Sequence, residues 1–178
     1  MRHYKGVSNY KSELVRFLDT EGLTGKEAFP QRSEKVRQLP RIFTLLSDVI
    51  VYVVEGSIFS NKQLLLGLKQ FVEESQKNLE TILFPSLVVA QNGAPMEECI
   101  LPIEASTKRF MELPESKEIS KKYKNVFCVN FPKIDVGVHK LQLLLERLEE
   151  TKYKIEQCFE EASEFKKNRD IITRRKSW

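Results

Sequence analysis

Residues 49–54, Val-Ile-Val-Tyr-Val-Val, most limit the folds that are open to this chain. All six side chains are β-branched or aromatic, which suits a pleated sheet, and Glu55 and Gly56 end the run. A strand that is apolar on both faces is typical of a sheet covered on both sides. The run therefore predicts a buried strand with a neighbouring strand on each side.

Strand-like and helix-like segments alternate along the chain, which predicts an α/β fold. Further strands are expected at residues 13–18, 87–90 and 126–130, and helices at 33–46, 61–79, 104–111 and 116–122. Pro40 should kink or divide the first of these helices, whose apolar face we expect to pack on the sheet. Ser60 or Asn61 should cap the second helix. The Asn92-Gly93 pair predicts a loop at residues 91–95, directly after a strand.

The C-terminal part contains a long amphipathic segment and a basic tail. Residues 138–167 place apolar side chains at helical spacing, so this helix either covers the sheet or begins a helical extension. Lys and Arg then cluster in residues 166–176, within a net charge of +4. Such a tail either binds an anionic membrane or nucleic acid through nonspecific electrostatics, or merely keeps the protein in solution. We expect no specific recognition of nucleic acid.

Composition indicates one modest globular domain. The 178 residues are 41% apolar and 30% charged, and no apolar stretch approaches the roughly 20 residues of a membrane helix. We expect a cytoplasmic protein, with peripheral membrane contact through the basic tail as an alternative. The three cysteines have no metal-ligand spacing and predict buried reduced thiols. His3 and His139 lack partners at metal spacing, so neither a metal centre built on them nor a hydrolytic triad is expected.

Asp19-Thr20-Glu21-Gly22 follows directly on the expected first strand. A nucleoside triphosphatase needs an acidic side chain at the carboxyl end of a strand to hold the magnesium shell. It also needs a glycine whose backbone N–H can approach the γ-phosphate. Asp and Gly are equally favoured in an ordinary turn after a strand. The four residues alone leave both interpretations open.

Four segments in order resemble the GTPase domain of the dynamin superfamily, nearest the guanylate-binding-protein and atlastin branch. They are residues 17–22 (FLDTEG), 45–58 (LLSDVIVYVVEGSI), 83–92 (LFPSLVVAQN) and 126–132 (VFCVNFP). The resemblance implies a three-layer sheet like that of P-loop nucleotide triphosphatases, incomplete at the N-terminus. It also implies GTP and Mg²⁺ as ligands, nucleotide-dependent dimerisation, and membrane or defence functions. Asp19 would hold the metal, Gly22 would contact the γ-phosphate, and Gln91 and Asn92 would lie near the base.

Two departures from that family set limits on nucleotide binding. The phosphate loop Gly-x-x-x-x-Gly-Lys-Ser/Thr should lie several dozen residues before Asp19, and residues 1–18 do not contain it. Where the family has Arg-Asp for guanine recognition, this chain has Gln91-Asn92. An amide offers one acceptor oxygen, and a buried donor that faces another donor costs about 1 to 3 kcal/mol. Asn92-Gly93 as a simple turn remains the alternative.

The sequence therefore supports two classes of function. One is a GTP-binding and GTP-hydrolysing fragment, inactive as an isolated chain and without an assigned catalytic residue. Its parts would be a partial GTPase domain at residues 1–135, an amphipathic helix at 136–168 and a basic tail at 169–178. The other is a non-catalytic interaction module that uses this helix and tail, alone or with a second copy or partner chain. Without the phosphate-loop strand, the sheet would keep a vacancy between the strands near Phe17 and Val51, or those strands would pair directly.

Overall fold

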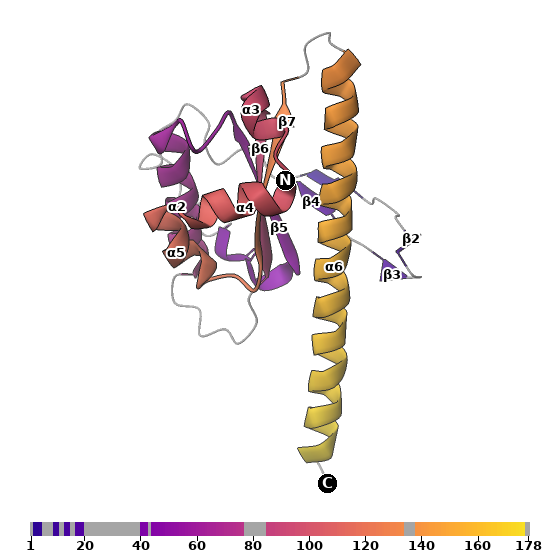
Figure 1. Cartoon of the computed structure of the whole chain (residues 1–178). Coiled ribbons are helices and arrows are strands. Elements are labelled where there is room, and N and C mark those ends of the chain that lie inside the picture. Colours follow the sequence, from indigo (N-terminus) through magenta and orange to yellow (C-terminus); the bar gives the residue numbers. More distant parts are fainter. Residues whose placement is uncertain are drawn as a thin grey trace. The chain divides into compact units, whose positions relative to one another are not determined.

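The computed structural model describes residues 2–4, 9–10, 13–14, 17–19, 40–42, 44–76, 85–133 and 138–176, with side chains for 40–42, 44–75, 85–133 and 139–164. The chain divides into two units, residues 1–36 and 37–178, which are described separately (Figure 1). In the first unit, β1 (Arg2–Tyr4) pairs antiparallel with β4 (Phe17–Asp19), and β2 (Asn9–Tyr10) pairs antiparallel with β3 (Glu13–Leu14). The single strand expected at residues 13–18 is thus two short strands, neither of which belongs to the larger sheet.

The second unit contains a parallel sheet of three strands in the order β5-β6-β7. The strands are β5 (Val49–Glu55), β6 (Ser86–Ala94) and β7 (Val126–Pro132), and the helices are α2 (Lys62–Gln76), α3 (Met96–Cys99), α4 (Ile103–Met111), α5 (Pro114–Ser120) and α6 (Val138–Lys176). Helices lie between successive strands, as parallel pairing requires. The predicted α/β class is confirmed at this level, whereas the P-loop-type sheet remains a prediction.

The two faces of the sheet are covered by different helices (Figure 1). α2 packs on the face that bears Tyr52, whose ring centroid lies 4.9 Å from that of Phe71. α6 packs on the opposite face, where Ile155 joins a core cluster that includes Val88 and Val129. Because side chains alternate along a strand, the sheet separates these two sets cleanly. Burial raises the pKa of Tyr52 to about 12, as expected for a phenol inside this layer.

β5 differs from the prediction of a strand enclosed on both sides. Ile50, Tyr52 and Val54 are buried, but Val51 is 47% exposed and Val53 is 64% exposed. Among the strands that the structure describes, β5 pairs with β6 alone. A β-branched run has the same sequence pattern whether one or both faces are covered, so its composition overstated its burial. Residues 40–42 and 44–46 are helical, but Ile42, Leu45 and Leu46 are exposed rather than packed on the sheet.

β6 is the central strand and runs further than expected. Residues 86–91 are all buried, and the strand continues through the predicted loop to Ala94. Gly93 has φ +76°, and the pairing with β7 shifts between Asn92 and Ala94. A glycine accepts this left-handed conformation without steric cost, so the Asn-Gly pair produces a bulge inside the strand instead of ending it.

The outer edge of β7 is covered by α4. The backbone N–H of Cys128 donates to Oγ1 of Thr107 at 3.0 Å, so a helix side chain takes the place of a neighbouring strand. The start of α2 matches the prediction, because Oδ1 of Asn61 accepts the backbone N–H of Gln63 at 3.0 Å. α4 and α5 also form close to the predicted positions.

α6 is a single helix of 39 residues, longer than predicted, and it includes most of the expected basic tail. Two ion pairs fix it to the body of the second unit: Nζ of Lys154 lies 2.8 Å from Glu104, and Nζ of Lys124 lies 2.9 Å from Glu161. Arg147, Thr151 and Cys158 of this helix are buried. One side of the helix is therefore anchored, which determines which side remains open.

Candidate functional site

The four residues predicted to bind nucleotide are not brought together as one described site. Asp19 is the last residue of β4, in the first unit. Gly22 lies outside the described residues, while Gln91 and Asn92 belong to β6 in the second unit. The structure therefore tests the geometry of Gln91 and Asn92, and the roles of Asp19 and Gly22 in holding metal and γ-phosphate stay predictions.

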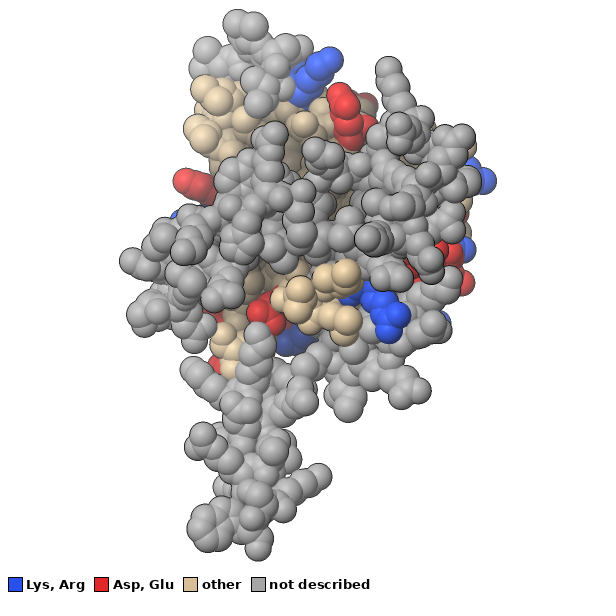
Figure 2. Space-filling model, turned by 180° about the vertical axis from the view of Figure 1, so that it is seen from behind, with Lys and Arg blue, Asp and Glu red and all other residues tan. Residues whose placement is uncertain are grey.

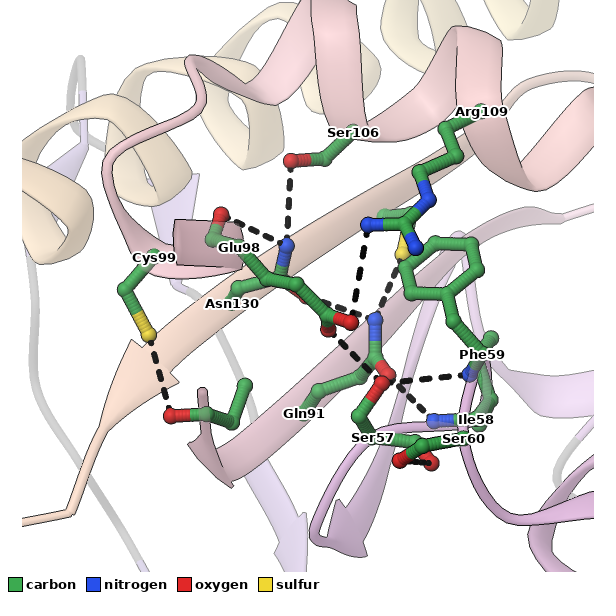
Figure 3. A network of polar contacts seen from close by, with 12 residues as sticks. Ser57, Ile58, Phe59, Ser60, Gln91, Glu98, Cys99, Ser106, Arg109 and Asn130 are labelled. Carbon is green, nitrogen blue, oxygen red and sulfur yellow. Dashed lines mark hydrogen bonds and ion pairs between the residues drawn. The ribbon is translucent and has the colours of Figure 1, made fainter. Parts of the chain in front are cut away.

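Gln91 is fully buried, and both ends of its amide are in use (Figure 3). Its Oε1 accepts the backbone N–H of Ile58 at 2.6 Å. Its Nε2 donates to Oδ1 of Asn130 at 2.6 Å and to Sγ of Cys128 at 3.1 Å. Turning this amide towards a base would leave buried donors and acceptors unpaired, at about 1 to 3 kcal/mol each. The structural setting of Gln91 is a strand interior rather than the predicted loop.

Asn92 is the accessible member of the pair. Its side chain is exposed, and it lies opposite Glu55 of β5 and Phe131 of β7 in the parallel register. Its backbone carbonyl accepts the N–H of Gly56 at 2.7 Å, which ties the end of β5 to β6. The exposed amide lies near the carboxyl ends of three parallel strands, the side on which open α/β sheets bind ligands.

Asn130 extends the network from the sheet to the helices. It is 1% exposed, and its Nδ2 donates to the backbone carbonyl of Glu98 at 3.0 Å and to Oγ of Ser106 at 3.1 Å. With Gln91 on its other side, the Asn130 amide connects β6, α3 and α4. Such a saturated network fixes the relative position of its elements.

Glu98 is a buried carboxylate at the centre of the same region. Its Oε2 accepts the hydroxyl of Ser57 at 2.7 Å, and Nη1 of Arg109 lies 3.5 Å from its Oε1. The guanidinium of Arg109 in turn lies over the ring of Phe59, 4.3 Å from its centroid. A carboxylate taken out of water needs this kind of compensation. Side chains of β6, α3 and α4 thus hold the turn that follows β5 (Figure 3).

Sequence reasoning missed Ser57, Glu98, Ser106, Arg109 and Asn130. One signal was present: Gln91 and Asn130 are polar residues within otherwise apolar strands, and they are direct partners in the register of β6 and β7. Aligning the two strands would have paired them. Glu98 and Arg109 could not be found in this way, because their contact depends on how α3 and α4 fold back.

The chemistry available in this network is limited. Its amides, hydroxyls and carboxylate hydrogen-bond to one another, and burial raises the pKa of the Cys128 thiol to about 12. Burial likewise raises the pKa of Cys99 to about 11 and raises that of Cys158. The prediction of buried free thiols is confirmed. Among the described residues, no group of three or more His, Cys, Asp or Glu could hold a metal ion.

A second candidate surface lies on α6. Leu141, Leu145 and Leu148 follow one another at spacings of four and three residues and are 55%, 54% and 47% exposed. This spacing places them on one side of the helix, and we call them the leucine stripe.

On the face shown in Figure 2, described basic and acidic side chains lie close to one another and form no large patch of one sign. In the part of the chain that the structure describes, no helix has the length and apolarity needed to cross a bilayer.

The chain matches no family model, no curated protein and no solved structure with which it was compared.

Proposed function

We propose that this chain is a non-catalytic protein-interaction module whose partner-binding element is α6. The observation that carries the proposal is the leucine stripe, three exposed leucines on a helix whose other side is fixed to the sheet. Three exposed leucines in a row cost solvation free energy unless another surface covers them. Ion pairs to Glu104 and Lys124 anchor the helix, so the stripe is presented on a supported element.

The state of the polar network also favours this proposal over autonomous nucleotide binding. Gln91, one of the two residues expected near the base, is engaged with Ile58, Asn130 and Cys128. The competing proposal is a GTP-binding fragment, in which Asp19 holds Mg²⁺, Gly22 contacts the γ-phosphate and Asn92 alone remains near the base. The two proposals differ in what the purified chain binds.

A titration with a fluorescent GTP analogue and Mg²⁺ tests the nucleotide side. We expect no saturable binding to the full chain up to tens of micromolar. Asn92→Asp, which restores a carboxylate beside the base position, should not create binding, because residues 1–18 lack the phosphate loop that would hold the nucleotide. Saturable, Mg²⁺-dependent binding that Asp19→Ala abolishes would overturn the non-catalytic proposal.

The interaction side is tested with matched variants of the full chain. Leu145→Glu places a charge in the leucine stripe, and Leu66→Glu makes the same change at a leucine of α2 that is 42% exposed. When other proteins are passed over the immobilised chains, the wild type and Leu66→Glu should retain the same ones. Leu145→Glu should not retain them. If all three chains retain the same set, the stripe is not the binding element.

A further inference from the structure

Two exposed valines of β5 lie on the sheet face that α6 covers. Val49 belongs to the cluster that includes Ile155 of α6, so α6 lies over the same sheet face as Val51 and Val53, which alternate with the inward-facing residues of β5. These two valines are 47% and 64% exposed. The leucine stripe itself extends along one side of α6. The surface is suited to a helical partner rather than to a small ligand.

Charge is distributed unevenly along α6. Residues 138–164 contain seven Glu against four Lys or Arg, while residues 165–176 contain six Lys or Arg against one Asp. The leucine stripe lies in the acidic segment, with exposed Glu146 and Glu149 beside it in the sequence. At about 1.5 Å per residue the helix is about 58 Å long, so its two segments cannot neutralise each other within one straight helix. A complementary partner must be basic where this helix is acidic.

A second copy of the same helix meets this requirement when it runs in the opposite direction. Antiparallel overlap lays the acidic segment of each α6 beside the basic segment of the other. Parallel overlap would instead place like charges together, which is unfavourable. The basic segment also contains Phe165, Ile171 and Ile172 as apolar residues in its sequence. The arrangement has twofold symmetry, so one pairing satisfies both stripes.

We infer that two copies of this chain associate through antiparallel α6 helices, each leucine stripe covered by the basic C-terminal segment of the other copy. This inference rests on the proposed interaction function and names its partner. The contact closes on itself after two copies.

Sedimentation equilibrium of the full chain tests the inference directly. We expect a mass of twice 20.8 kDa at high concentration and the monomer mass on dilution. The dissociation constant should rise with salt, because ions screen the contacts between segments. Leu145→Glu should raise it by about tenfold or more, equivalent to about 1.4 kcal/mol, while Leu66→Glu leaves it unchanged. A monomer at every concentration, or a dimer indifferent to both salt and Leu145→Glu, would refute the inference.

Charge reversal distinguishes antiparallel from parallel pairing. Lys166→Glu with Lys167→Glu should weaken the dimer, and adding Glu146→Lys with Glu149→Lys to the same chain should recover part of the affinity. Absence of any recovery, with circular dichroism showing intact helix, contradicts the antiparallel arrangement. If the chain is monomeric but Leu145→Glu still fails to retain the proteins that bind the wild type, a second copy is not the partner. The proposal of an interaction module then still holds. If no retention depends on the stripe, the proposed function itself fails.

Discussion

The carboxyl ends of the parallel strands and the outer side of α6 show opposite kinds of surface. At the strand ends, Gln91, Asn130 and Glu98 are buried, and each is hydrogen-bonded or paired within the chain. On α6, Leu141, Leu145 and Leu148 are about half exposed. The first region is closed by its own contacts, and the second is left open. A position at the carboxyl ends of a sheet is therefore insufficient evidence for a ligand site when its polar groups already satisfy one another.

Within the two regions, Gln91→Ala should have the largest effect on stability. The substitution removes the acceptor of the Ile58 N–H and the donor to Asn130, and it leaves a cavity in the central strand. We expect a loss of about 3 kcal/mol in the free energy of unfolding. Urea denaturation measures it, with Asn92→Ala, one residue away and exposed, as the control. Equal effects at the two positions would show that the network is not the closed region described above.

Ser57→Ala should have a smaller effect at the same end of the sheet. The hydroxyl donates to Glu98 at 2.7 Å and accepts the backbone N–H of Phe59 at 3.1 Å. Its removal should cost about 1 kcal/mol. Ser60→Ala, at an exposed hydroxyl of the same turn, serves as the comparison in urea denaturation. If Ser60→Ala lowers the free energy of unfolding as much as Ser57→Ala does, the hydrogen bonds of Ser57 are not what stabilises the turn.

The ion pair between Lys154 and Glu104 should contribute still less and should depend on pH. The hydrogen bond from Lys154 is the main cause that lowers the pKa of Glu104 below the ordinary value of 4.5. A lowered carboxyl pKa adds stability above that ordinary value, and this stability is lost as the pH falls through the folded-state pKa. Lys154→Met should destabilise the chain by about 0.5 kcal/mol near neutral pH, because both groups are partly solvated.

The same substitution should have a smaller effect near pH 3 than near neutral pH, because the ion pair is lost as the pH falls through the lowered pKa of Glu104. Urea unfolding of the wild type and Lys154→Met at the two pH values measures the difference. Lys152→Met removes a more exposed and longer pair, with Nζ 3.9 Å from Glu156, and should show a weaker pH dependence. If Lys154→Met destabilises the chain equally at both pH values, the loss comes from the contact of Lys154 with the Phe127 ring and not from the ion pair.

Leu145→Glu should have the smallest effect on the stability of the single chain. The side chain is half exposed, so we expect a change of less than about 0.5 kcal/mol in the free energy of unfolding, measured in urea at dilutions that favour the monomer. Leu68→Glu, at a fully buried leucine of α2, provides the contrast and should unfold the chain. A large loss for Leu145→Glu under these conditions would mean that the stripe already packs within its own chain.

Much of the second unit could be predicted from periodicity. The positions of β5 and β7, the cap at Asn61 and the start of α6 follow from apolar spacing and from local backbone chemistry. These signals are short in range, so one segment is enough to show them. The length of α6 was underestimated, because the charged residues after 167 interrupt its apolar pattern without ending the helix.

The polar network could not be predicted in the same way. Gln91 was assigned to a loop because Asn92, Gly93 and Pro95 are turn-forming residues, yet the strand continues through Asn92 and Gly93 to Ala94, with a bulge. Its partner Asn130 lies 39 residues away, so no local window contains both. The exposure of Val51 and Val53 has the same origin, since a strand's sequence does not state which neighbours cover it.

The bond between Thr107 and Cys128 has a consequence for how the sheet can grow. A strand added at the outer edge of β7 would have to displace a helix side chain and leave its hydroxyl to find another partner. Strand addition to the described sheet is thereby confined to β5. Because edge-to-edge polymerisation needs two open edges on every subunit, α4 opposes open-ended fibre formation through the described three-stranded sheet, whose association by this route stops at a pair.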